Sequence, residues 1–314
     1  MASSRFLSFL CCLLSTQTVP LITLAQPAML YHDCLPGKGN YSANSSYQEN
    51  LNQLLTSIYT NTEIDSGFYN LSHGQDPDKV YANGLCRPDI TPESCRACLK
   101  SASENLTTLC PNSTEAIGGS DNCMLRYTYR SIFGIMEGLP YFFVYSLNNV
   151  SDLIVFKQSR RTLLDRLRDQ AAAGNSRYKY ATGDTDVSNS SQKIYALVQC
   201  TPDLSKQQCS DCLSQATGLL SQCCDERQGG RIITPSCNFR YEINLFYDPA
   251  ALGKPEKLPT LPVPAAQPSP PPTSTGRTGK ASNIAPTLII GSFPMLFFFY
   301  ALARHPSMIF TIFF

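Results

Sequence analysis

Residues 86–98 of the chain read CRPDITPESCRAC, and residues 200–212 read CTPDLSKQQCSDC. Each stretch has a cysteine followed by a proline–aspartate pair, and it ends with two cysteines separated by two residues. Five cysteines of the first half recur 114 residues later: Cys86, Cys95, Cys98, Cys110 and Cys123 match Cys200, Cys209, Cys212, Cys224 and Cys237. Such a repeat predicts two homologous domains, at about residues 26–140 and 150–250.

Each repeat is predicted to contain two helices. The first helix is indicated by apolar residues at helical spacing: Leu51, Leu54, Leu55 and Ile58 in the first repeat, and Leu163, Leu164 and Leu167 in the second. The second helix is expected to begin just before Cys95 and Cys209. Thr91 precedes a proline, which suits the first helical position, and Ser205 lies three residues before Gln208, the spacing of a capping box.

Strands are expected on either side of the second helix. Val80–Ala82 and Ile194–Val198 are short β-prone runs that lead into the first cysteine of each motif. From Cys237 to Leu245 apolar and polar residues alternate, which predicts a closing strand with one buried face. Two helices over an antiparallel sheet, held by disulfides, is the α+β arrangement that this order favours.

Composition excludes several classes of function. The 314 residues carry a formal net charge of +1 and only 16% charged residues, so the basic surface that nucleic-acid binding requires is missing. One of the three histidines lies near the C-terminal end, so a histidine-based metal centre would have to be built from His32 and His73 alone. The C-x2-C pairs favour disulfides over zinc. No nucleophile elbow, phosphate-binding loop or kinase signature occurs. We expect no enzyme, no cofactor, no metal and no nucleic-acid partner.

Residues 1–25 are predicted to be a cleaved secretory signal. Arg5 gives a positive start, an apolar run over residues 6–14 follows, and small residues precede the expected cleavage point. The apolar run is shorter than the ~20 residues that a membrane span needs. Cleavage removes Cys11 and Cys12, which leaves twelve of the 14 cysteines in an oxidising compartment where disulfides persist.

Two further segments follow the second repeat. Residues 253–283 are rich in proline, serine and threonine, cannot bury a core, and are predicted to form an extended stalk. Residues 284–303 hold no charge and as a helix would extend about 30 Å, the thickness of the hydrocarbon core. We expect them to span the membrane with both domains outside. The alternative is the removed tail of a lipid-anchor signal, because small residues and a polar spacer precede it.

The sequence around the cysteines resembles a known family. Residues 197–204 read LVQCTPDL, residues 235–242 read PSCNFRYE, and Cys-x8-Cys-x2-Cys occurs twice. These motifs closely resemble the tandem extracellular domains of plant cysteine-rich receptor-like kinases and cysteine-rich repeat secretory proteins, whose single-domain relative is the antifungal seed protein ginkbilobin. The resemblance covers about residues 30–250. It implies two ginkbilobin-type domains of the α+β class, each with two helices on a five-stranded antiparallel sheet.

The resemblance also implies a disulfide scheme, where six cysteines alone would allow fifteen connectivities. The implied bridges are Cys34–Cys110, Cys86–Cys95, Cys98–Cys123, Cys200–Cys209 and Cys212–Cys237. Cys223 and Cys224 remain, because Asn148 stands 114 residues after Cys34. They can pair with each other, stay reduced or bond another chain. We favour the vicinal pair, since an exposed free thiol is a liability in an oxidising compartment.

A sugar site is a further implication of the resemblance. Ginkbilobin binds mannose through an asparagine near its start, an arginine before its last cysteine and a glutamate just after it. Arg231 and Glu242 occupy the two later positions in the second domain, whereas the first domain has Ile117 and Thr128 there. The asparagines at residues 148–149 are only near the remaining position. The alternative interpretation is that Arg231 and Glu242 form a surface ion pair.

Glycosylation sequons support an extracellular location. Asn-x-Ser/Thr occurs at Asn40, Asn44, Asn70, Asn105, Asn112, Asn149 and Asn189, all before the stalk.

A plant cell-surface recognition module, similar to a receptor ectodomain without its kinase, accounts for the signal, the repeats, the stalk and the span together. Its expected partners are an unknown extracellular protein or glycan ligand and a receptor kinase through which it acts in defence or stress signalling. The alternative function is a secreted or lipid-anchored mannose-binding antifungal protein.

Overall fold

The computed structural model describes residues 29–188 and 190–251. The segments expected to form the signal peptide, the stalk and the membrane span, residues 1–25, 253–283 and 284–303, lie outside these ranges. Within the described ranges, no helix is both long and apolar enough to cross a bilayer.

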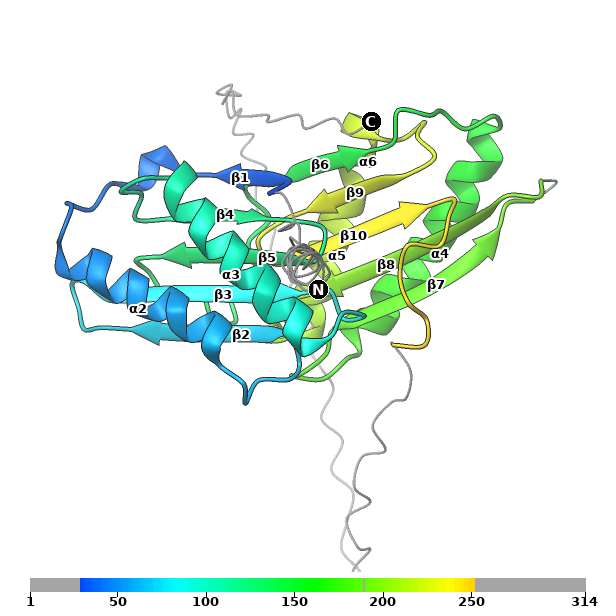
Figure 1. Ribbon diagram of the computed structural model, residues 1–314. Helices are drawn as coiled ribbons and strands as arrows, with labels where there is room; N and C mark the ends of the chain where they lie inside the picture. Colours follow the sequence, from blue (N-terminus) through cyan, green and yellow to red (C-terminus); the bar gives the residue numbers. More distant parts are fainter. Residues whose placement is uncertain (1–28, 189, 252–314) are drawn as a thin grey trace, which may run out of the picture. The chain divides into compact units, whose positions relative to one another are not determined.

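The first repeat forms a five-stranded antiparallel sheet with the strand order β1-β4-β5-β3-β2 (Figure 1). Its elements are β1 (Tyr31–Asp33), the short 3-10 helix η1 (Pro36–Lys38), α2 (Ser46–Thr60), β2 (Phe68–His73), β3 (Val80–Cys86), α3 (Pro92–Leu109), β4 (Ala116–Gly119) and β5 (Cys123–Thr128).

The second repeat forms a sheet of the same topology, with the order β6-β9-β10-β8-β7. Its elements are β6 (Phe142–Tyr145), α4 (Leu153–Ala172), β7 (Tyr180–Asp186), β8 (Lys193–Cys200), α5 (Lys206–Gly218), the single-turn α6 (Leu220–Cys223), β9 (Gly230–Ile233) and β10 (Cys237–Glu242). The expected α+β class, with helices on two five-stranded antiparallel sheets, is confirmed. The second sheet starts at β6, upstream of the boundary expected at residue 150.

Local sequence signals place the helices as expected. The Thr91 hydroxyl accepts a hydrogen bond from the backbone N–H of Ser94, and α3 begins at the following proline. At α5, the Ser205 hydroxyl accepts from the backbone N–H of Gln208, whose side chain accepts from the backbone N–H of Ser205. Each cap satisfies backbone donors that the first helical turn leaves free.

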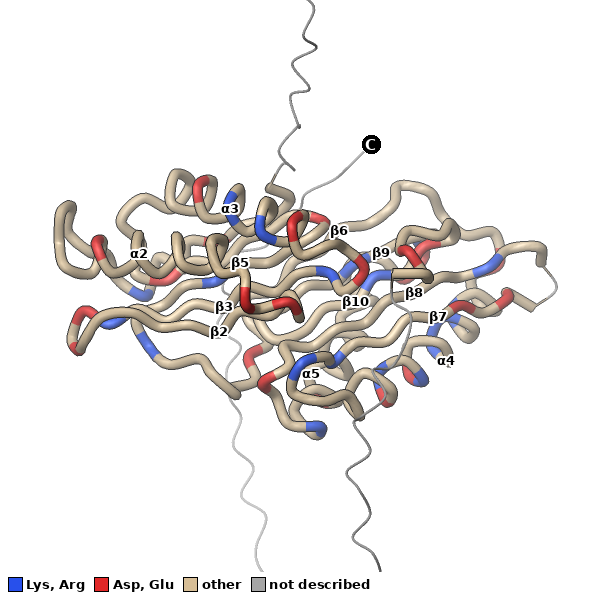
Figure 2. Tube along the Cα trace, turned by 60° about the horizontal axis from the view of Figure 1, so that its bottom comes forward, with Lys and Arg blue, Asp and Glu red and all other residues tan. Residues whose placement is uncertain are grey.

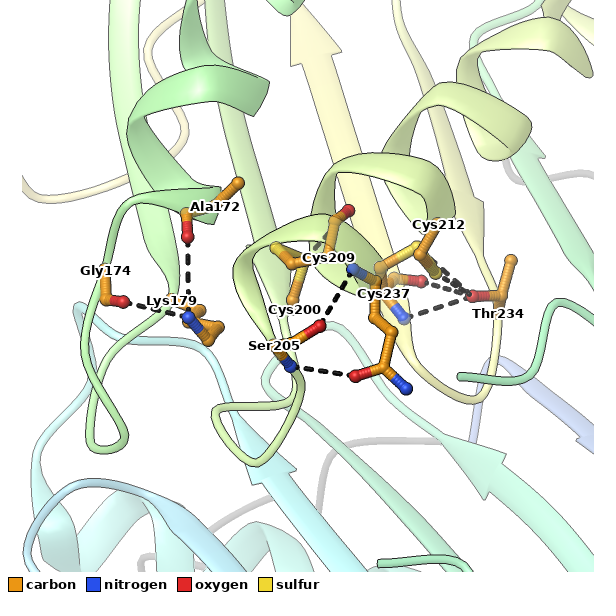
Figure 3. The surroundings of a disulfide bond; sticks show 10 residues. Ala172, Gly174, Lys179, Cys200, Ser205, Cys209, Cys212, Thr234 and Cys237 are labelled. Atoms are coloured by element: carbon orange, nitrogen blue, oxygen red, sulfur yellow. Dashed lines mark hydrogen bonds between the residues drawn. A yellow bond between two sulfur atoms is a disulfide. The ribbon is translucent and has the colours of Figure 1, made fainter. Parts of the chain in front are cut away.

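A separate apolar core lies between each sheet and its helices, with disulfides inside it. In the second domain the bridges Cys200–Cys209 and Cys212–Cys237 join α5 to β8 and β10 (Figure 3). The Thr234 hydroxyl donates to the carbonyl of Cys237 at 2.9 Å and fixes the turn between β9 and β10. These covalent links compensate for the small core that a domain of about 100 residues can build.

A third apolar cluster joins the two domains. It combines Tyr31, Leu85, Ile117 and Met124 of the first domain with Phe142 and Ile233 of the second. β4 and β5 are buried along their whole lengths, which requires both faces of these strands to be covered. Figure 2 shows α2 and α3 on one side of the strands and α4 and α5 on the other.

The expected closing strand of the second domain needs correction. Alternation predicted a strand from Cys237 to Leu245 with one buried face, but β10 ends at Glu242 and Leu245 is 51% exposed. The polar face is itself mostly covered, since Asn238 is buried and Arg240 is only partly exposed. Contact with the first domain, which a period of two cannot reveal, accounts for this covering.

Candidate functional site

A cavity of about 530 Å³ opens where the two domains meet, and we call it the Arg231 cavity. Asp121 of the first domain lines it together with Arg231, Arg240 and Glu242 of the second. Tyr145 and the loop after β6 form another part of its wall. This volume falls in the range of small-molecule sites, which are about 300–1,000 Å³.

The register of the second sheet places the charged residues together. Arg231 on β9 lies opposite Arg240 on β10, and Val144 on β6 lies opposite Arg231. Arg240 and Glu242 are two residues apart on β10, so they share a face, while Tyr241 between them packs in the core. The polar residues of the alternating pattern therefore form one face of the sheet at its border with the first domain.

Asp121 is the centre of an ion-pair network that crosses between the domains. Its carboxylate accepts from Arg231 at 3.2 Å, from Arg240 at 2.9 Å and from Arg87 of its own domain at 3.0 Å. Arg240 also donates to the carboxylate of Glu242 at 3.0 Å. The two guanidinium groups of the second domain, bonded to this carboxylate, hold the turn between β4 and β5 against that domain.

Burial affects two charged side chains of the cavity, Arg231 and Glu242. Arg231 is only 8% exposed, and its Nε finds no hydrogen-bond partner among the described residues. Burial lowers the pKa of the Arg231 guanidinium, although the nearby Tyr31 and Asp121 oppose this shift. Burial raises the pKa of Glu242 above its ordinary value, although Arg240 opposes it. Groups desolvated in this way mark candidate binding sites.

The structure places the candidate sugar residues in one site. Asn148 lines the cavity with Arg231 and Glu242. Asn149 is engaged elsewhere, because its side-chain oxygen accepts from Arg227 at 2.7 Å. The alternative interpretation, an ion pair between Arg231 and Glu242, is not what the structure has: Arg231 pairs with Asp121, and Glu242 pairs with Arg240.

The first domain differs from the second at the two positions equivalent to Arg231 and Glu242. Ile117 and Thr128, at the positions equivalent to Arg231 and Glu242, are both fully buried. Ile117 belongs to the apolar cluster between the domains. The surface that bears the cavity in the second domain is thus used for domain contact in the first.

Sequence reasoning missed Asp121, Arg240 and Tyr145. Arg240 was assigned only to the alternating pattern of a strand, and its spacing to Glu242 was the available signal for a shared site. Asp121 belongs to the other repeat, and no local pattern reports a contact between residues more than 100 positions apart.

The cysteines are all paired in the part of the chain that the structure describes. The bridges are Cys34–Cys110, Cys86–Cys95, Cys98–Cys123, Cys200–Cys209, Cys212–Cys237 and the vicinal pair Cys223–Cys224. Across the same residues, no group of three or more His, Cys, Asp or Glu side chains is arranged to hold a metal ion.

The sequons differ in exposure. Four of them, Asn40, Asn44, Asn112 and Asn149, are exposed. Asn70 and Asn105 are half-buried, and their side-chain nitrogens donate to Asp203 at 3.2 Å and to the carbonyl of Ser101 at 2.8 Å. Asn189 lies outside the described residues.

Comparison with known proteins assigns the chain to a family. The model of the Stress-antifung family, described as salt stress response/antifungal, matches residues 33–130 and again residues 145–244. The chain belongs to this family. Cysteine-rich repeat secretory protein 38 of Arabidopsis thaliana is 36% identical over 219 residues, which cover 70% of this chain and 86% of that protein.

Receptor kinases share the same region. Cysteine-rich receptor-like protein kinase 29 of Arabidopsis thaliana is 39% identical over 248 residues, which cover 78% of this chain. The match spans 36% of the length of that kinase. In this chain the family model covers residues 33–130 and 145–244, so the tandem region is the part of the chain that the family match describes.

Solved structures show the same fold. The tandem DUF26 ectodomain of the Arabidopsis thaliana cysteine-rich receptor-like protein PDLP8 has a TM-score of 0.59 at 24% identity, covering 68% of this chain and 97% of that chain. The corresponding ectodomain of PDLP5 has a TM-score of 0.54 at 28% identity, covering 68% and 98%. The family model and the relatives confirm the predicted family, and the solved structures show its tandem fold.

Proposed function

We propose that the chain is an extracellular recognition module that binds a small, hydroxyl-rich ligand in the Arg231 cavity. The single observation that carries this proposal is the convergence of Asp121 from one domain with Arg231, Arg240 and Glu242 from the other. Two cationic and two anionic side chains balance each other. The cavity therefore suits a neutral ligand that both donates and accepts hydrogen bonds, such as a sugar.

Further lining residues support a sugar over other neutral ligands. Asn148 adds an amide, which supplies donors and an acceptor at one point. Leu30 and Tyr145 add apolar surface against which the C–H face of a sugar ring can pack. Mannose is the first candidate because Asn148, Arg231 and Glu242 are the residue types that the sequence resemblance implies for it.

The test is binding of neutral monosaccharides, mannose first, to the full chain and to Glu242→Gln. This variant keeps the size of the side chain and removes its charge, so we expect at least about tenfold weaker binding if Glu242 accepts from a ligand hydroxyl. Glu104→Gln, on an exposed face of α3, is the control and should bind like the unaltered chain. Equal binding by both variants, or no binding by the unaltered chain, would contradict the proposal.

We also propose that the chain acts at the outside of the plasma membrane, through a partner. Support comes from relatives named as secretory proteins and receptor-like protein kinases, which share these domains. In this proposal residues 284–303 anchor the chain, and a receptor kinase carries the signal inward. Proximity labelling at the surface of intact cells would identify the partner. Release of the chain by a phosphatidylinositol-specific lipase would instead indicate that a lipid anchor, and not a membrane span, holds the chain.

A further inference from the structure

A second cavity, of about 550 Å³, lies among the helices of the second domain, and we call it the cationic groove. It is bounded by α4 on one side and by α5 and α6 on the other, and Leu164 and Leu220 contribute its apolar surface. None of its lining residues belongs to the Arg231 cavity. The cationic groove is therefore a separate site, and ligand binding there does not depend on whether the Arg231 cavity binds a sugar.

One wall of the groove is a charged stripe along α4. Lys157, Arg161, Asp165 and Arg168 follow each other at intervals of four, four and three residues, which puts them on one face of the helix. At 1.5 Å per residue, the stripe extends for about 16 Å. Figure 2 shows blue and red positions following one another along α4.

The opposite wall carries hydroxyl groups. Ser214, Thr217 and Ser221 recur at helical spacing on α5 and the start of α6, and Gly218 lies between them. A side chain added at Gly218 would find no atom within 4 Å of its Cβ, so the groove is open at this point. A cationic stripe therefore faces a hydroxyl stripe across open space.

Positive charge exceeds negative charge in the groove. Four cationic residues and two carboxylates line it: Lys157, Arg160, Arg161 and Arg168 against Asp165 and Asp225. Asp225 is shared by Lys157 and Arg160, and Asp165 is shared by Arg161 at 3.8 Å and Arg168 at 2.8 Å. Arg168 also pairs with Asp169, which is not among the lining residues, at 3.0 Å. Arg161 is 87% exposed, and among the described residues it holds only this long contact, so its guanidinium has donors available for an anion.

The lining distinguishes between classes of anion. A single phosphate ion would engage only one end of a stripe of this length. The groove is lined by no aromatic side chain, and its polar groups are charged side chains on one wall and hydroxyls on the other. An extended ligand that alternates carboxylates with hydroxyls matches both walls at once.

The corresponding face of the first domain lacks this arrangement. The displacement of 114 residues puts Lys100 at the position of Ser214 and Glu104 at that of Gly218. Lys100 and Glu104 form a pair with each other at 4.0 Å. A carboxylate thus occupies the position that is open in the second domain.

We propose that the cationic groove binds linear acidic oligosaccharides, whose uronate carboxylates pair with Lys157, Arg161 and Arg168 and whose hydroxyls bond the opposite wall. Binding of this kind weakens as salt is added, because exposed ion pairs are screened. It also depends on chain length, because a longer oligomer reaches more of the stripe.

The experiment measures binding of galacturonic acid oligomers to the full chain by calorimetry. Neutral galactose oligomers of equal length, inorganic phosphate and vesicles of anionic lipid are the comparison ligands. We expect the acidic oligomers to bind, to bind more tightly with increasing length, and to be released by salt. Equal binding of the neutral oligomers, or full competition by phosphate or by the vesicles, would overturn the proposal.

Variants locate the binding site. Arg161→Gln removes an exposed charge and should weaken binding by about fivefold, while Gly218→Trp should fill the groove and abolish it. Lys100→Gln, the matched control on the first domain, and Glu242→Gln in the Arg231 cavity should both bind like the unaltered chain. Arg161→Gln is at the surface and tests the site even if Gly218→Trp does not fold. Binding that Glu242→Gln weakens and Arg161→Gln does not would overturn the proposal.

Discussion

Replacing Asp89 with alanine is expected to weaken the contact between the two domains. The Asp89 side chain is 2% exposed, and it accepts from Arg87 Nε at 2.6 Å and Nη2 at 2.7 Å. It also accepts from the backbone N–H of Asp248, which follows the last strand of the second domain, at 3.0 Å. The Asp89 carboxylate thus binds an arginine of its own domain and the segment that follows the last strand of the second domain.

The size of the effect follows from what the substitution leaves behind. Removing one partner of a buried ion pair costs about 3–5 kcal/mol, because the other charge stays buried. Arg87 keeps its bond to Asp121 at 3.0 Å and to the carbonyl of Phe246 at 3.3 Å, and its side chain is 15% exposed. We therefore expect the lower end, a loss of about 3 kcal/mol in the free energy of unfolding.

The second repeat offers a matched comparison. Asp203 stands 114 residues after Asp89, and it accepts from the backbone N–H of Gly134, which stands 114 residues before Asp248. Each aspartate therefore holds the segment that follows the last strand of the other domain. Asp203 has Asn70 at 3.2 Å in place of an arginine, so Asp203→Ala should cost about 1–2 kcal/mol, the range of one or two ordinary hydrogen bonds.

The assay is denaturant unfolding of a fragment of residues 26–251, followed by circular dichroism. The control is Asp186→Ala. The Asp186 side chain is 81% exposed, so its removal should change the free energy of unfolding by less than about 0.5 kcal/mol. The reasoning would be refuted if the free energy of unfolding of Asp89→Ala lay within about 0.5 kcal/mol of that of the unaltered fragment, or if Asp89→Ala lost less stability than Asp203→Ala.

The effect should also depend on pH. Burial alone would raise the pKa of Asp89, but the hydrogen bonds from Arg87 and from the Asp248 N–H outweigh it and lower this pKa. A lowered pKa in the folded state gives stability that is present above the unfolded value, about 3.9, and that is lost as pH falls through the folded value. The difference between the unaltered fragment and Asp89→Ala should therefore shrink in acid. A difference that grows below about pH 4 would contradict the ion-pair explanation.

Three further outcomes are expected. A Cβ at Gly229 would lie 1.8 Å from the Glu242 carboxylate, the end of a flexible side chain. Gly229→Ala should therefore displace the Glu242 carboxylate and abolish sugar binding, as calorimetry would show. It should change the free energy of unfolding by less than about 1 kcal/mol. Glycopeptide mass spectrometry should find Asn112 occupied and Asn70 free, because the Asn70 side-chain nitrogen bonds Asp203; a glycan on Asn70 would contradict this contact. Non-reducing peptide mapping should find Cys223–Cys224 as a loop within one peptide, and alkylation of either thiol would exclude the pair.

Features encoded by neighbouring residues could be predicted from the sequence. The caps at Thr91 and Ser205 act over three residues, and they placed the start of α3 and α5. The alternation around Phe239 likewise identified β10, because side chains of a strand point to opposite faces. The repeat of the cysteines fixed the number of domains and the resemblance to the family.

Features that depend on contact between the domains could not be predicted. β10 ends at Glu242 although alternation continues, and the β6 strand lies in a stretch that carried no assignment. Arg231 was a candidate, but its partner Asp121 lies in the other repeat and became apparent only when the two domains were seen together. Periodicity describes one element against its own core, and it does not report what covers the other face.

Duplication has given the two copies of one fold complementary roles. At equivalent positions of their sheets, the first domain has the apolar Ile117 and the second has Arg231. Ile117 seals the contact between the domains, while the guanidinium of Arg231 reaches the carboxylate of Asp121 in the first domain. The cavity needs both domains, since Asp121 neutralises arginines that burial would otherwise disfavour. A ligand that bonds these arginines must therefore share them with the carboxylate that holds the domains together, which ties recognition in this cavity to domain contact.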